Sequence, residues 1–193
     1  MRFTLSTSAA VLSAALWVAP AHALTFSDFV TGAALDAALG QNQTIGFTYA
    51  GNKFVGSVYF GTNNNQLYST DLTGGSVQTF GAPIAGFSGE IYVSASLGVG
   101  GYGARDVFAG SEAGNSIYRI SKDGTTQSQF AGTGIVGGVR SIAFDPYGLY
   151  GNQMLVATNA GNIYTVSNTG TATLLASVGE DAEGLSFAPQ TFG

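Results

Sequence analysis

The chain has 193 residues, of which only 6 are Lys or Arg and 11 are Asp or Glu, and it contains 29 Gly and no Cys. Charged residues make up 9% of it, against about 25% in an average globular domain, which excludes a nucleic-acid partner bound through a basic surface. The hydrophobic residues, 45% of the total, are enough to form a core, and the length predicts one domain.

Residues 1–23 have the features of a secretory signal peptide. Arg2 supplies a positive start, an apolar stretch follows over residues 9–18, and Ala21, His22 and Ala23 form a small-x-small cleavage pattern. The stretch is too short and too rich in Ser and Ala to span a bilayer comfortably, and no later run approaches the length of a spanning helix. We therefore predict an exported protein, secreted or periplasmic, without a transmembrane segment after cleavage.

Cleavage after Ala23 removes the only histidine, His22, and also Arg2, so that the net charge changes from −5 to −6. A mature chain without His or Cys cannot form a Ser-His-Asp hydrolase, a Cys nucleophile, or a zinc or copper site built on imidazole or thiolate. Any chemistry must come from carboxylates, amides, hydroxyls and five basic side chains.

Three segments of the chain share one pattern centred on a tyrosine. Tyr68, Tyr118 and Tyr164 each follow an aliphatic residue, precede an Asp or Ser by three positions and precede a Gly by six. The surrounding residues alternate between apolar and polar, which is typical of strands, and the glycine is able to take a positive φ in a tight hairpin. The recurrence of these tyrosines indicates packing positions rather than a unique site.

Four short strands every 40 to 50 residues predict an all-β fold, a β-propeller of four-stranded antiparallel blades. We expect blades at about 44–81, 90–131 and 138–177, with a fourth unit that opens with a strand at 183. The N-terminal segment 24–43 precedes them and contains a predicted short helix within 27–39, with Asp28 near its start and Gly40 after its end.

The run from Gly138 to Gly148, with the strands that follow it, resembles blades of the six-bladed propeller superfamily, which includes NHL-repeat, TolB-like and gluconolactonase-type proteins. The resemblance covers about residues 44–189 and implies the fold rather than an activity. Six blades need more residues than this chain has. We expect a fragment of a longer protein; a ring completed by a second copy and a compact four-bladed form are the alternatives.

The innermost strands of a propeller line a central channel, so residues at the starts of these strands converge at one mouth. Glu90, Arg140 and Glu183 occupy such positions, and we predict a ligand site there. Glu183 and Asp181 belong to the densest acidic cluster of the chain, and with Glu90 they are candidate ligands for calcium. The alternative interpretation is a solvated acidic loop.

These features are compatible with two functions. The first is a secreted or surface-associated binding module without catalytic activity, whose ligand is a small molecule, a glycan or a protein. The second comes from the Glu183-Gly184 pair, which resembles the start of a metal-binding strand in gluconolactonase-type proteins and implies a metal-dependent lactone hydrolase. That family also uses Asn and Asp ligands from other blades, and the sequence contains no matching motif. We therefore favour binding.

Overall fold

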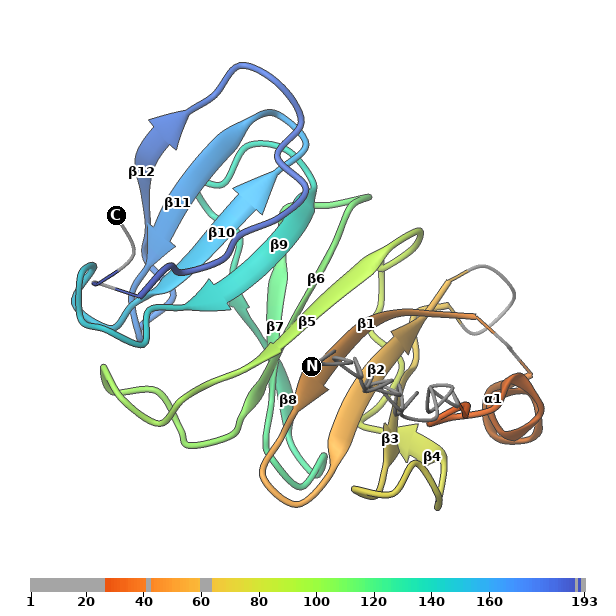
Figure 1. Cartoon of the computed structure of the whole chain (residues 1–193). Coiled ribbons are helices and arrows are strands. Elements are labelled where there is room, and N and C mark those ends of the chain that lie inside the picture. The colour runs from red at the N-terminus through yellow and green to blue at the C-terminus, as the bar shows by residue number, and fades with distance from the viewer. Residues whose placement is uncertain (1–26, 41–42, 60–63, 190, 192–193) are drawn as a thin grey trace, which may run out of the picture.

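The computed structural model describes residues 27–40, 43–59, 64–189 and 191. Within these ranges the chain forms one helix and twelve strands, and the strands make three separate four-stranded antiparallel sheets. The sheets fan out from a shared centre like the blades of an unclosed propeller (Figure 1). The predicted all-β fold of four-stranded blades is confirmed, whereas the predicted signal peptide, residues 1–23, lies outside the described residues.

Each sheet contains four strands that follow one another in the sequence and pair with their neighbours. The first sheet consists of β1 (Thr44–Tyr49), β2 (Phe54–Val58), β3 (Leu67–Thr70) and β4 (Gln78–Phe80). The second consists of β5 (Ile91–Ala95), β6 (Val107–Ser111), β7 (Ile117–Ile120) and β8 (Gln127–Ala131). The third consists of β9 (Val139–Phe144), β10 (Met154–Thr158), β11 (Asn162–Val166) and β12 (Ala172–Ser177). The first strands β1, β5 and β9 lie next to one another at the centre.

The repeated sequence pattern corresponds to the hairpin between the third and fourth strands of each sheet. The glycine six positions after each tyrosine has a positive φ in all three hairpins: 85° at Gly74, 80° at Gly124 and 82° at Gly170. Its N–H donates to the backbone carbonyl three residues earlier, over 2.8–3.2 Å. Only glycine adopts this backbone conformation at little cost, which explains its recurrence and confirms the predicted turn.

Apolar side chains fill the spaces between successive sheets. The first two sheets enclose a cluster that includes Leu67, Phe80, Ile91, Val107 and Ile120. The second and third enclose a cluster that includes Phe108, Val139, Met154, Val156 and Val166. Because the side chains of a strand alternate between faces, each blade presents one apolar face to the blade before it and the other to the blade after it.

Helix α1 (Gly32–Leu39) covers the face of the first sheet that points away from the second sheet. Leu35 and Leu39 of the helix pack against Tyr68. At the equivalent positions of the later sheets, Tyr118 and Tyr164 belong to the apolar layers shared with the preceding blade. The helix therefore occupies the place that a preceding blade would take.

The helix is shorter than the sequence predicts and does not begin near Asp28. It begins after Thr31, whose side-chain oxygen accepts a hydrogen bond from the Ala34 N–H over 3.2 Å, and it ends at Gly40 with a φ of 67°. Such a threonine satisfies a backbone N–H that no helical carbonyl can reach. Phe29 lies before this cap and packs edge-on against the rings of Phe47 and Phe54.

The chain after β12 runs back alongside β9 (Figure 1). Residues 181–189 contain no strand, and the fourth unit expected at 183 stays a prediction. The Leu185 N–H donates to the Ser141 side chain over 3.1 Å, but no described strand forms a ladder with this segment. Alternating side chains alone do not make a strand, which needs a partner for its backbone groups.

Candidate ligand site at one end of the central strands

Arg140, the second residue of β9, binds four carboxylates at one end of the central strands. Its Nη1 lies 2.6 Å from Glu112 and 3.1 Å from Glu90, and its Nη2 lies 3.0 Å from Asp181 and 3.7 Å from Glu183. We call these five residues the Arg140 cluster. It gathers side chains that are up to 93 positions apart in the sequence, from Glu90 to Glu183.

The pairing of β5 with β6 brings the first two carboxylates together. Glu90 directly precedes β5 and Glu112 directly follows β6, and antiparallel pairing places these two ends side by side. The Glu112 N–H donates to the Glu90 carbonyl over 3.0 Å, and the Glu90 N–H donates to the Glu112 carboxylate over 2.9 Å. Arg140 reaches both because β9 lies beside β5.

The other two carboxylates belong to the segment that follows β12 and lie nearer the solvent. Asp181 hydrogen-bonds to Nη2 of Arg140, and Glu183 completes the cluster at a longer distance. The Glu183 side chain is 68% exposed, against 16% for that of Arg140. Glu90 and Glu112 therefore form a partly buried floor of the cluster. Asp181 and Glu183 form a rim that ligands can reach.

The cluster carries more negative than positive charge. Burial alone would lower the pKa of Arg140, but its bonds to Tyr92 and Asp181 outweigh this effect and raise the pKa, so the guanidinium stays charged. Burial, and then the hydrogen bond to Glu90, raises the pKa of Tyr92 to about 12, so this phenol stays neutral at physiological pH. One cation thus faces four carboxylates. In addition, the Nε of Arg140 is buried and has no hydrogen-bond partner among the described residues.

The structure brings together all four residues that the sequence predicts for the channel mouth or the calcium site: Glu90, Arg140, Asp181 and Glu183. Sequence reasoning missed Glu112 and Tyr92. A usable signal existed for Glu112, because a residue that follows the second strand of a blade must lie beside the start of its first strand.

The predicted calcium ligands Glu90, Asp181 and Glu183 point toward the guanidinium of Arg140 instead of surrounding a space between them. Across residues 27–189, as far as the structure describes them, no group of three or more His, Cys, Asp or Glu side chains has the spacing of a metal site. Calcium binding stays a prediction.

A second feature is an apolar pocket on the face of the third sheet that points away from the second. Its volume is about 610 Å³, and its lining includes Tyr150, Leu155, Ile163, Leu175 and Phe187. In a larger ring a further blade would pack against this face. Among the described elements, none is a helix with the length and apolar character needed to cross a membrane.

No protein-family model matches the chain, and no curated protein matches it. Solved structures do. A crystal structure of a nidogen–laminin complex aligns with a TM-score of 0.56 and 11% identity, over 72% of this chain and 51% of that one. The computationally designed protein Ika4 aligns with a TM-score of 0.56 and 13% identity, over 86% of this chain and 89% of Ika4. The designed protein Ika8 aligns with a TM-score of 0.51 and 14% identity, over 76% and 40% of the two chains.

At such low identities the likeness concerns the fold alone. Together with the three four-stranded sheets, it defines a β-propeller-like protein. The chain spans about half the length of the nidogen–laminin chain that it matches. The more specific resemblance to NHL-repeat, TolB-like and gluconolactonase-type blades stays a prediction.

Proposed function

We propose that the protein is an exported binding module without catalytic activity, and that it holds a positively charged ligand at the rim of the Arg140 cluster. The observation that carries this proposal is the surplus of carboxylates: four of them surround one guanidinium at the same end of the central strands. A propeller-like fold is consistent with a binding role, and the signal-peptide pattern of residues 1–23 supports export.

The rim carboxylates are suited to a cation because one guanidinium neutralises only one of the four carboxylates, although Asp181 also accepts a hydrogen bond from it over 3.0 Å. Glu90 and Glu112 lie closest to Nη1 of Arg140, whereas Glu183 lies 3.7 Å from Nη2 and is largely exposed. At about 4 Å, each opposite charge contributes about 1 kcal/mol in water and about 4 kcal/mol near a protein surface. Two rim carboxylates can therefore hold an ammonium group, which donates three hydrogen bonds, or a calcium ion.

Calorimetric titration with spermidine and with calcium chloride tests the binding site. We expect saturable binding of at least one of them, weakened about fivefold or more when Asp181→Asn and Glu183→Gln are combined. The control is Glu180→Gln, which removes the same type of charge from a neighbouring residue with no ion pair to Arg140. Absence of saturable binding, or equal weakening by the control, would contradict the proposal.

Two further experiments test the proposed absence of catalytic activity and the proposed export of the protein. A calcium-loaded protein that hydrolyses simple lactones, with the activity lost in chelator, would replace the binding proposal by the hydrolase alternative. Export predicts that the full chain, produced in a bacterium, appears in the periplasm or medium with Leu24 as its first residue.

A further inference from the structure

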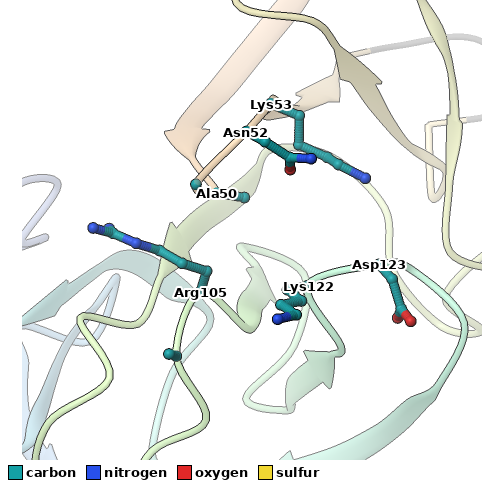
Figure 2. A pocket seen from close by; sticks show the side chains of 8 residues that line it. Ala50, Asn52, Lys53, Arg105, Lys122 and Asp123 are labelled. Carbon is teal, nitrogen blue, oxygen red and sulfur yellow. The ribbon is translucent and has the colours of Figure 1, made fainter.

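A cleft at the opposite end of the blades is lined by three of the six Lys and Arg residues of the sequence. It lies between the β1–β2, β5–β6 and β7–β8 loops, has a volume of about 350 Å³, and is lined by Lys53, Arg105 and Lys122 with Asn52 and Asp123. The Arg140 cluster adjoins the start of β5, whereas this cleft adjoins its end. Figure 2 shows the three basic residues on different sides of the opening.

The concentration of positive charge is unusual for this chain. The whole sequence has six Lys and Arg residues and a net charge of −5, yet three of the six line this one cleft. The remaining two in the described ranges, Arg119 and Arg140, are both paired with carboxylates. No ion pair with a described carboxylate involves any of the three cleft cations.

Two of these cations lie over aromatic rings. The guanidinium of Arg105 lies 5.2 Å from the centre of the Tyr49 ring, and the ammonium of Lys53 lies 5.5 Å from the centre of the Phe80 ring. Both side chains are half-buried, and neither contact involves a carboxylate. A multivalent anion can therefore draw both side chains toward the opening without breaking an ion pair.

The acidic residues near the cleft are already engaged. Asp123 accepts hydrogen bonds from Ser121, from the Thr125 N–H and from the Thr125 hydroxyl, all inside its own hairpin turn, and its carboxylate points away from the opening (Figure 2). Asp106 forms an ion pair with Arg119. Counting the charged residues that line the cleft, the positive charges exceed the negative ones by two.

We propose that this cleft binds a small multivalent oxyanion, either a phosphate group or a di- or tricarboxylate. The shared chemistry is two or more negatively charged oxygens within a compact molecule. Arg105 offers a planar fork of N–H donors that matches both kinds of anion, and Lys53 and Lys122 offer ammonium groups from two further loops. This site is separate from the proposed cation site around Arg140.

Titration with pyrophosphate and with citrate, at constant ionic strength set by sodium chloride, tests the proposal on the whole protein. We expect saturable binding with one equivalent of at least one anion, and the preferred anion identifies the phosphate or carboxylate source. Lys53→Met and Lys122→Met should each weaken binding about five- to tenfold, because each removes one charge-assisted hydrogen bond. Lys53→Arg and Lys122→Arg keep the charge and should retain binding within about threefold.

Gln129→Glu is the matched control, because it lowers the net charge by one at an exposed residue of the same sheet, outside the cleft lining. The proposal is overturned if neither anion binds saturably at concentrations up to about 10 mM. It is also overturned if Gln129→Glu weakens binding as much as Lys122→Met, because the anion would then respond only to net charge. Thermal unfolding of each variant without ligand verifies that it is folded.

Discussion

The replacement Tyr102→Phe isolates one buried hydrogen-bonding group that joins two blades. Tyr102 lies in the loop between β5 and β6, and its ring is only 6% exposed in the apolar layer between the second and third sheets. Its hydroxyl donates to the Val166 carbonyl and accepts a hydrogen bond from the Met154 N–H over 3.1 Å. Phenylalanine keeps the ring contacts and removes both bonds.

The expected loss of stability comes from the two backbone groups that lose their partner. A buried polar group without a partner costs about 1–3 kcal/mol. For two such groups we expect the free energy of unfolding to fall by about 2–6 kcal/mol. For a protein of 150–250 residues, about 1 kcal/mol shifts Tm by about 2–4 °C, which gives a decrease of at least about 4 °C.

Urea unfolding, followed by far-UV circular dichroism, measures this change. The variant should show a lower midpoint with an unchanged slope. Tyr147→Phe is the matched control: this tyrosine is 42% exposed, and we expect less than about 0.5 kcal/mol of change. If Tyr102→Phe and Tyr147→Phe have the same midpoint as the unaltered protein, the hydroxyl of Tyr102 does not stabilise the contact between the blades.

The remaining predictions concern a close backbone contact and a buried carboxylate. A Cβ on residue 138 would lie 1.7 Å from the Glu112 carbonyl oxygen, so Gly138→Ala should destabilise the protein by about 1–3 kcal/mol or more, whereas Gly114→Ala, with open space around it, should change stability by less than about 1 kcal/mol in a thermal melt. Asp145 is buried, and although burial alone would raise its pKa, hydrogen bonds from the Tyr150, Tyr147 and Asn152 N–H groups outweigh this and lower the pKa. Since the folded pKa lies below the unfolded one, its stabilising effect is present at neutral pH and is lost as the pH falls below about 4. Asp145→Asn should therefore lower the midpoint of urea unfolding at pH 7, and the difference from the unaltered protein should shrink in acid; a difference independent of pH would contradict this assignment.

The local pattern of the sequence determined the blades. Strand and hairpin geometry depend on residues within a few positions of one another, so the spacing from tyrosine to glycine predicted three turns, and each of these glycines has a positive φ. The same locality limits what the sequence can say about the fourth unit expected at residue 183. Alternation predicted a strand there, but a strand also requires a partner, which local sequence does not specify.

The candidate site was predicted only in part. The positions of Glu90, Arg140 and Glu183 at the starts of inner strands followed from the repeat, and these residues do lie in one cluster. The direct contact between Arg140 and Glu112 joins the ends of strands in two different blades, and it depends on how the blades are arranged around the centre. No spacing in the sequence encodes that arrangement.

Sequence alone thus determined the repeated hairpins, the all-β class and the shortage of reactive side chains, because these depend on residue identity and short-range geometry. Tertiary structure alone decided that Tyr102 enters the layer between two blades, that α1 takes the place of a preceding blade, and that three cations gather at one cleft. These features join residues far apart in the sequence. Packing of whole sheets, rather than the preference of any single segment, brings them into contact.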